Sequence, residues 1–188
     1  MGSGGASLVV GAHGFIGSAL ADRLAQAGED VVRTTRRRDA VSDGIAFLDL
    51  SESVDRWRPP KPIHTAYLCA AVTSIDQCRR APRHSAVVNV AHTTRLAEAL
   101  VAQGAFVVFL STNQVFDGTV PRRKAEDAVC PVTEYGRQKA EAEKRLLALG
   151  DSVSVIRVTK VLGARTPLMD RWIGALRRGQ TIRPFSDM

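Results

Sequence analysis

Residues 7–36 read SLVVGAHGFIGSALADRLAQAGEDVVRTTR, and this stretch decides the fold class. The apolar run at 7–10 is typical of a buried strand, and apolar side chains recur at helical spacing through 18–27 until Gly28 ends the helix. A second strand begins at 30–32. A strand, a glycine-rich turn, a helix and a second strand within about 30 residues form the setting that a dinucleotide-binding turn requires.

Three glycines, Gly11, Gly14 and Gly17, stand at three-residue intervals in the turn. Glycine permits a tight exit from the strand, a close approach of the backbone to a pyrophosphate and close packing of the helix on the strand. The free N–H groups and the dipole at the start of a helix attract the phosphates. The residues that we expect to bind a dinucleotide in this turn are Gly11, His13, Gly14, Phe15, Ile16 and Gly17.

Length and composition predict a globular domain with a sizeable core, since the chain has 188 residues of which 45% are hydrophobic. No apolar run approaches the length that spans a membrane, so no membrane partner is expected. The first residues, MGSGGA, lack the charged-then-apolar order of a signal peptide. We therefore expect a cytoplasmic protein.

The net charge of +7 and the pI near 9.9 raise the question of nucleic-acid binding. The basic residues are scattered, aromatic residues make up 5% of the chain and no nucleic-acid motif is present, so we expect anionic small molecules as partners and no nucleic acid. Cys69, Cys78 and Cys130 form no CxxC pair, and the histidines show no metal-ligand spacing. No metal site is expected.

The second strand ends at Thr35 and Arg36, where enzymes specific for NAD usually carry a carboxylate that holds the ribose 2′-hydroxyl. No carboxylate stands there, and Asp39 comes too late in the chain. A guanidinium can instead bind a 2′-phosphate through charge-assisted hydrogen bonds. The sequence thus favours NADP over NAD, with Arg36 as the first contact and Arg37 as a second. The alternative is a solvated basic turn.

Two apolar runs, at 63–71 and 106–110, predict the fourth and fifth strands, and a long helix is expected between them over 83–103. Ala70 and Ala71 close the fourth strand, and small residues at the carboxyl end of a strand leave room for a ligand. The fifth strand leads into 111–118 at the same edge of the sheet. We expect the chemistry to lie at this edge.

Tyr135 and Lys139 lie one turn apart on a helix predicted over 133–149. A tyrosine, with a pKa of about 10, needs a nearby cation to act as an acid or base at neutral pH, and Lys139 supplies one. Lys139 can also hold the ribose of a nicotinamide, and Thr112 offers a hydroxyl to a substrate carbonyl. The residues expected on the solvent side of this helix are Glu141, Glu143 and Lys144.

Four motifs, GAHGFIG, LSTNQVFDG, YGRQKAEAE and IRVTKVLG, resemble those of the extended short-chain dehydrogenase/reductase superfamily, and the last three are most similar to its dTDP-4-dehydrorhamnose reductase branch. The resemblance implies an α/β fold, a Rossmann-type doubly wound parallel sheet with helices on both faces. It also implies NADPH-dependent reduction of the 4-keto group of a nucleotide sugar. In that reaction Tyr135 would protonate the carbonyl oxygen, Thr112 would polarise it, and Lys139 would lower the pKa of the tyrosine.

A third strand is predicted over 45–50, followed by a short helix over 52–57 that Ser51 caps. The resemblance places Asp49 and Leu50 at the adenine of the cofactor. The alternative is that Asp49 only caps the next turn, which its side chain is well suited to do.

The resemblance implies further contacts with the cofactor and the substrate. The other cofactor contacts would be Ala70, Ala71, Tyr135, Lys139, Arg157 and Val158. The substrate contacts would be Thr73, Ser111, Thr112 and Asn113. Asn89, in the middle of a helix, would support the active-site backbone, the alternative being an exposed or back-bonded polar residue. Asn113 and Gln114 stand where the reductase branch usually has Asp-Tyr, and this departure alters the expected substrate pocket.

Residues 1–163 are expected to form the NAD(P)-binding domain, and 164–188 the start of a smaller substrate-binding lobe with a helix over 167–178. Two functions stay open. One is a sugar-nucleotide oxidoreductase, a reductase rather than an epimerase or dehydratase. The other is a cofactor-binding regulatory subunit without turnover. Helices 83–103 and 133–149 pair subunits in many relatives, so a homodimer is expected.

Overall fold

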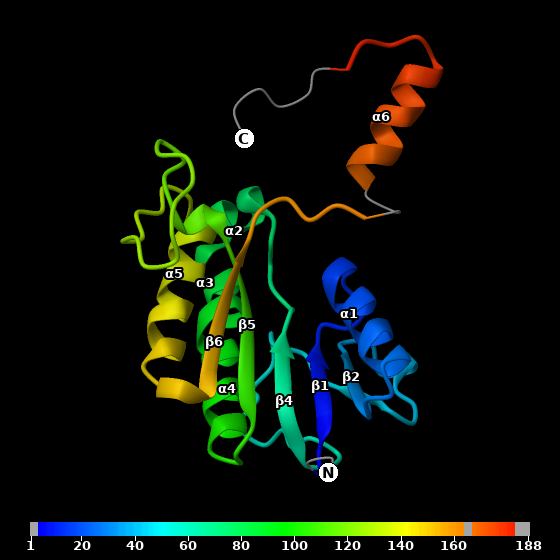
Figure 1. Ribbon diagram of the computed structural model, residues 1–188, viewed down its shortest axis with the longest axis vertical. Helices are drawn as coiled ribbons and strands as arrows, with labels where there is room; N and C mark the ends of the chain where they lie inside the picture. Colours follow the sequence, from blue (N-terminus) through cyan, green and yellow to red (C-terminus); the bar gives the residue numbers. More distant parts are fainter. Residues whose placement is uncertain (1–3, 164–166, 183–188) are drawn as a thin grey trace. The chain divides into compact units, whose positions relative to one another are not determined.

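The computed structural model describes residues 4–163 and 167–182, and the chain divides into two units, residues 1–158 and 159–188 (Figure 1). The first unit contains a six-stranded sheet in the order β3-β2-β1-β4-β5-β6, with every pairing parallel. The second contains α6 (Pro167–Arg177). The strands are β1 (Ala6–Val10), β2 (Val31–Thr35), β3 (Ile45–Phe47), β4 (Ile63–Leu68), β5 (Phe106–Thr112) and β6 (Val153–Val158).

The direction in which the chain adds strands reverses at β1, because β2 and β3 lie on one side of it and β4, β5 and β6 lie on the other. Open α/β sheets bind their ligands beyond the carboxyl ends of the strands at such a reversal. The carboxyl end of β1 leads into Gly11, and that of β4 leads into Ala70. The fold therefore brings the glycine turn and the alanine pair to one crevice.

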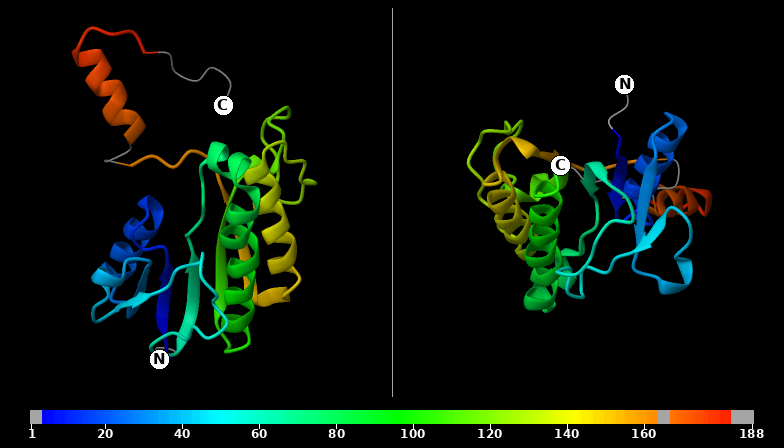
Figure 2. Two further views of the ribbon diagram at one scale, coloured as in Figure 1. Left: turned by 180° about the vertical axis from the view of Figure 1, so that it is seen from behind. Right: turned by 90° about the horizontal axis from the view of Figure 1, so that it is seen from below.

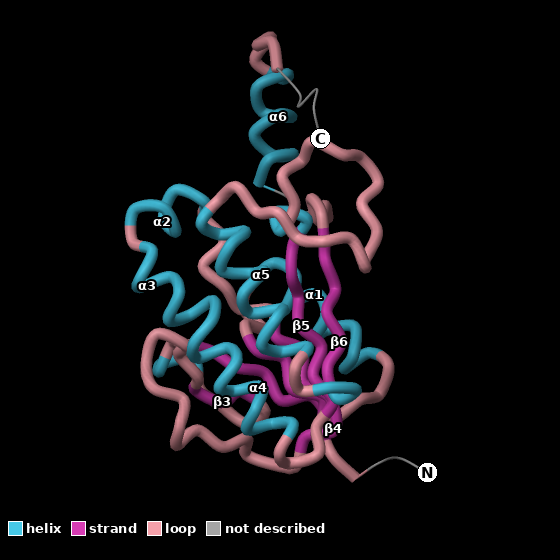
Figure 3. Tube along the Cα trace, turned by 90° about the vertical axis from the view of Figure 1, so that its left-hand side faces the viewer, coloured by secondary structure: helices cyan, strands magenta, loops and turns pink. Residues whose placement is uncertain are grey.

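Helices cover both faces of the sheet, as the resemblance implied (Figure 2). Helix α1 (Phe15–Gln26) packs on β1 and β2. The opposite face carries α4 (Thr93–Val101) and α5 (Glu134–Leu147). Helix α4 continues from α3 (Pro82–Ala86) and a π-helical segment, η2 (Val87–His92), and this run lies beside α5 (Figure 3). The short helix α2 (Ile75–Arg80) precedes it.

Side chains of β5 alternate between the two faces, as in any strand. Phe109 is buried in a large core with Leu96 of α4 and Leu146 of α5. On the opposite face Phe106 of β5 and Ile156 of β6 are 40% and 47% exposed. The core of the first unit is therefore thickest beneath α4 and α5, which is the side from which the predicted catalytic helix approaches the sheet.

The prediction of a short helix over 52–57 is wrong, because this segment is a series of turns. The N–H and hydroxyl groups of Ser51 both donate to Asp49 Oδ1 at 2.8 Å, so Ser51 serves the turn instead of capping a helix. Trp57 Nε1 donates to the carbonyl oxygen of Phe47 at 2.8 Å. Such side-chain hydrogen bonds offer the backbone an alternative to helix formation.

Most strands match the expected positions and differ at their ends. Strand β4 ends at Leu68, before the predicted end at 71, whereas β5 runs past the predicted end at 110 to Thr112 because it pairs with β6 as far as that residue. Within residues 4–163 and 167–182, no helix is long and apolar enough to cross a membrane. In the same ranges no group of three His, Cys, Asp or Glu side chains gathers as a metal-ligand set.

Candidate active site

The glycine turn is closed by contacts that only glycine allows. Gly11 has φ +85°, and a Cβ added to it would lie 2.9 Å from atoms of Ala70. The N–H of Gly11 donates to Thr34 Oγ1 at 3.1 Å, and the N–H of Gly14 donates to the carbonyl oxygen of Gly11 at 2.9 Å. A Cβ on Gly17 would overlap that same carbonyl. The turn, β2 and the end of β4 therefore pack so closely that no side chain fits at Gly11 or Gly17.

The start of α1 is open to an anion. Gly14 is the N-cap and supplies no side-chain hydrogen bond, and the first turn of the helix has no acidic residue. The first N–H groups of a helix lack partners within it and carry partial positive charge. His13 and Phe15 beside them are exposed. These observations fit the pyrophosphate-binding role predicted for the turn.

The basic residues after β2 differ in their partners. Arg37 Nη2 lies 2.9 Å from Asp39 Oδ2, and Arg38 Nη2 lies 3.2 Å from Glu52 Oε2. Arg36 is exposed and forms no ion pair with a described residue. Arg36 is therefore the guanidinium of this group that no carboxylate holds in an ion pair, and it acts on the Asp49 carboxylate through its charge.

Asp49 caps the turn after β3, and the contact of Asp49 and Leu50 with the adenine of a cofactor stays a prediction. Burial by itself would raise the pKa of the Asp49 carboxyl, but the hydrogen bonds from Ser51 and the charges of Arg36 and Arg38 bring it below its usual range. Leu50 is buried in the core shared with α4 and α5. Capping the turn keeps the Asp49 carboxylate ionised close to Arg36.

Lys139 is buried at the end of β5. Its Nζ donates to the carbonyl oxygen of Leu110 at 2.6 Å and lies 3.8 Å from the ring centroid of Phe109. Burial lowers the pKa of Lys139 to about 7, against an opposing effect of Glu143. The ammonium is therefore fixed two residues before Thr112, at the edge of the sheet where the sequence predicted the chemistry.

Tyr135 lies one turn before Lys139 in α5 and is partly buried. Burial raises the pKa of Tyr135 to about 12, with a smaller contribution from Cys78. The expected lowering of this pKa by Lys139 is not found in the structure, because burial of the phenol is the largest effect on it. At neutral pH the phenol holds its proton.

Thr112 ends β5 and is buried, and its Oγ1 accepts a hydrogen bond of 3.2 Å from the N–H of Gln114. The Oγ of the neighbouring Ser111 is buried and makes no hydrogen bond within the described part of the chain. Asn113 is exposed in a short 3₁₀ turn, η3 (Asn113–Val115). A Cβ on Gly136 would overlap the carbonyl oxygen of Gln114, so α5 begins in direct contact with this turn.

Asn89 holds the backbone at Val72, the kind of support that the resemblance implied, and the alternative of an exposed or back-bonded residue is wrong. Its side chain is 1% exposed. Asn89 Oδ1 accepts from the N–H of Val72 at 2.8 Å, and Nδ2 donates to the carbonyl oxygen of Val72 at 3.0 Å. Ala71 and exposed Thr73 flank Val72, so Asn89 holds the segment that carries both.

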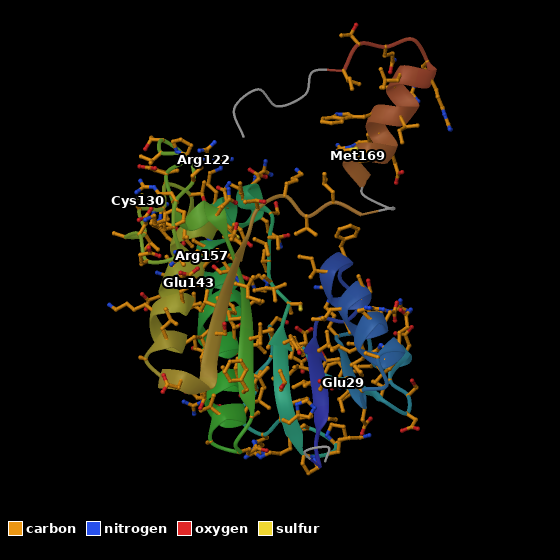
Figure 4. All side chains as sticks on the ribbon, in the orientation of Figure 1. Glu29, Arg122, Cys130, Glu143, Arg157 and Met169 are labelled. Atoms are coloured by element: carbon orange, nitrogen blue, oxygen red, sulfur yellow. The ribbon has the colours of Figure 1, made fainter. Side chains whose placement is uncertain are left out.

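Arg157 is directed toward α5 instead of being free at the crevice, and Figure 4 shows it beside Glu143. The closest atoms of the two side chains, Arg157 Nη2 and Glu143 Oε2, are 2.7 Å apart. Arg157 Nη1 also donates to the carbonyl oxygen of Ala125 at 2.9 Å. The prediction that Glu143 faces solvent is wrong, because the residue is 2% exposed and its carboxylate is paired. Val158, the next residue, is the last of β6.

Sequence reasoning missed two side chains of the active-site helix. Glu143 follows Tyr135 and Lys139 at successive intervals of four, which places it on their face. Gln138 precedes Ala142 and Leu146 at the same interval, and those apolar residues mark the buried face. This spacing was the available signal for both.

The family model described as RmlD substrate binding domain matches residues 6–182. The chain belongs to this family. The matched range includes the glycine turn, Thr112, Tyr135 and Lys139. The candidate site of this RmlD-family chain therefore lies within the part that matches the family model.

Two curated relatives show what the RmlD-family chain is similar to. Methionine adenosyltransferase 2 subunit beta of Rattus norvegicus is 31% identical over 157 residues, which are 83% of this chain and 47% of the relative. The dTDP-4-keto-6-deoxy-D-glucose reductase of Streptomyces niveus is 34% identical over 158 residues, which are 83% of this chain and 52% of the relative. The chain thus spans about half the length of the curated relatives it matches.

A solved structure extends this likeness to three dimensions. MoeE5 in complex with UDP-glucose and NAD matches 97% of this chain with a TM-score of 0.75 and 30% sequence identity, and the match covers 64% of MoeE5. This RmlD-family chain therefore has the same α/β fold as MoeE5, which is the fold class that its glycine turn predicted.

Proposed function

We propose that this RmlD-family chain is the cofactor-binding part of an NADP-dependent oxidoreductase that reduces a keto group of a nucleotide-activated sugar. The observation that carries the proposal is the pairing of a protonated phenol, Tyr135, with Lys139 one turn later, beside Thr112 at the carboxyl end of β5. The likeness to a named keto-sugar reductase and to MoeE5 with UDP-glucose and NAD supports it.

The crevice residues fit a dinucleotide. Gly11 and Gly17 leave a cradle that a Cβ would fill, and the uncapped start of α1 directs N–H groups to it. Ala70 and Ala71 would line the cofactor, and Arg36 would hold a 2′-phosphate, which is the reason to favour NADP over NAD. When bound, the reduced nicotinamide supplies a hydride.

Side chains of this protein would donate the proton that the substrate oxygen takes up and would stabilise the charge on that oxygen. Tyr135, with a pKa near 12, stays protonated at neutral pH and would donate to the substrate oxygen as negative charge develops there. Thr112 Oγ1 already accepts from Gln114, which leaves its hydroxyl hydrogen for the same oxygen. Lys139 would stabilise the anion through its charge. Thr73, Ser111 and Asn113 would orient the sugar.

The test is turnover of NADPH with a panel of nucleotide 4-keto sugars, followed by absorbance of the reduced nicotinamide. Tyr135→Phe should lower the rate about 100-fold or more, because it removes the proton donor. Tyr67→Phe is the matched control, since Tyr67 is the other tyrosine of the chain and lies on β4 away from α5. Equal rates for Tyr135→Phe and wild type would reject the mechanism.

A second function, a cofactor-binding subunit without turnover, is favoured by one specific observation. The relative from Rattus norvegicus is named as a subunit of methionine adenosyltransferase 2. Asn113 in place of the usual carboxylate agrees with it. Saturable NADPH binding without oxidation of NADPH by any sugar of the panel would establish this function over the first.

We also propose a homodimer formed through α4 and α5. Two surface pockets of about 420 and 500 Å³ lie on these helices and on the α3–η2 run that precedes α4. Ala91 and Arg145 line both pockets. Ala91→Arg should shift the protein to monomer in sedimentation velocity. Ala19→Arg, on exposed α1, should not. A monomeric wild type would reject this arrangement.

A further inference from the structure

Gln138 lies between Tyr135 and Lys139 in the sequence of α5. Its side chain is not available to a substrate, because it is hydrogen-bonded within the protein. It is 4% exposed. Its Nε2 donates to Ser85 Oγ at 2.8 Å and to Glu134 Oε1 at 3.0 Å, and lies 3.2 Å from the carbonyl oxygen of Pro82. The amide nitrogen therefore ties α5 to α3.

The carbonyl side of the same amide leads toward the crevice. Gln138 Oε1 accepts from Asn89 Nδ2 at 2.9 Å, and Asn89 in turn binds both backbone polar groups of Val72. The Cys78 thiol donates to the same Val72 carbonyl at 3.3 Å. Two side-chain amides in series thus connect the helix of Tyr135 to the segment 70–73.

The local backbone is built around this chain of contacts. Asn89 lies in the π-helical segment between α3 and α4, and such widened turns often occur at functional sites. Helix α5 contacts this segment directly. Asn89 of this segment hydrogen-bonds both to Val72 and to Gln138, so the two amides meet at the widened turn.

We propose that Gln138 is a positioning residue that, through Asn89, sets the distance between the helix bearing Tyr135 and Lys139 and the segment bearing Ala71 and Thr73. The inference deepens the proposed function and rests on it for its catalytic consequence. A misplacement of about 1 Å between reacting groups can cost a hundredfold in rate, so a fixed spacer of this kind has a direct effect on the site.

An amide supplies both a donor and an acceptor at position 138. Asn89 needs an acceptor there, while Ser85 and Glu134 need a donor. A carboxylate would lack the donor and would face Glu134, and an alkyl chain would lack both groups. A buried polar network that is partly satisfied is worse than one that is complete, because the unpaired groups stay desolvated.

The test compares Gln138→Met with Gln103→Met, a matched control in which an exposed glutamine loses a hydrogen bond of 2.8 Å to the carbonyl oxygen of Ala99. The first measurement is hydrogen exchange on the protein without ligands. Gln138→Met should accelerate exchange in 70–73 about tenfold or more and leave the core strand β1 protected. A loss of protection in both segments, or in neither, would overturn the proposal.

The second measurement is NADPH affinity by nicotinamide fluorescence, where Gln138→Met should bind about tenfold more weakly and Gln103→Met like wild type. Unchanged affinity would overturn the proposal. If Gln138→Met does not fold, Ser85→Ala removes one acceptor of the amide and should produce a threefold effect in both measurements, with no effect again contradicting it. A wild type that binds no NADPH would refute the proposed function, while the exchange result would still decide whether Gln138 holds the segment.

Discussion

Glu143 and Arg157 form a two-pronged ion pair beneath the active-site edge. Arg157 Nη2 donates to Glu143 Oε2 at 2.7 Å, and Nε lies 3.1 Å from each carboxylate oxygen. The guanidinium also lies 5.1 Å from the ring centroid of Phe116 and binds the carbonyl of Ala125. One side chain of β6 therefore holds α5 and the loop that follows Thr112.

Arg157→Met should lower the free energy of unfolding by about 3 kcal/mol, because it leaves the Glu143 carboxylate buried and unpaired. Urea unfolding checks this value. Arg79→Met breaks an exposed pair, Arg79–Asp76 at 2.8 Å, and should cost less than about 1 kcal/mol. Adding Glu143→Gln to Arg157→Met should recover part of the loss. If the two arginine variants unfold alike, the pair has no special energetic role.

Lys139 makes stability depend on pH in a defined direction. Its pKa is about 7 in the folded protein and near 10.5 when unfolded. Between these pH values the unfolded state binds more protons than the folded state, so stability rises with pH. Below pH 7 the folded protein bears the full cost of burying the charged Lys139. From pH 7 to 8.5 the free energy of unfolding of wild type should increase by about 1–2 kcal/mol relative to that of Lys139→Met. Urea unfolding at both pH values measures this change. A constant difference would show that the ammonium is not desolvated.

Gly136→Ala should disturb the contact between α5 and the turn after Thr112. The added methyl would overlap the Gln114 carbonyl oxygen and lie 3.1 Å from Pro131 Cβ. Overpacking of this kind costs about 1–3 kcal/mol, and NADPH affinity should fall with it. In Gly174→Ala, a control in α6, the nearest atom is Arg178 Nη1 at 3.4 Å, and the thermal midpoint should not fall. A Gly136→Ala protein as stable as wild type would contradict the close approach.

Arg36→Ala should weaken NADPH binding about 10- to 100-fold and leave NADH binding unchanged, because a hydrogen bond to a charged group contributes about 1.5–3 kcal/mol. Fluorescence titration with both cofactors measures the ratio. Arg37→Ala should have a smaller effect, since Arg37 is paired with Asp39. Equal weakening toward both cofactors would remove the assignment of Arg36 to a 2′-phosphate.

The parts of the fold that sequence predicted well depend on neighbours in the chain. The apolar run before Gly11, the glycine spacing and the four-residue interval between Tyr135 and Lys139 are local patterns, and each lies where it was expected. Asn89 was placed correctly through the resemblance, because its partner Val72 belongs to the same supersecondary unit.

The parts that sequence missed depend on groups that only the folded chain brings together. Glu143 is buried because the β5–β6 register places Arg157 against it, and Ser51 forms a turn because the Asp49 carboxylate competes for its N–H. The high pKa of Tyr135 comes from burial, a quantity that spacing along one helix does not contain. Predicting these features requires the packing of separate elements.

The acceptor that fixes the Lys139 ammonium is the main-chain carbonyl of Leu110. Every amino acid has that carbonyl, so a saturation mutagenesis scan of position 110 would report only the fit of the new side chain. The anchor thus depends on where α5 places Lys139 against the backbone of β5, and the side chain at position 110 does not encode it. Substitutions at this position can change the side chain while the acceptor of the ammonium stays in place.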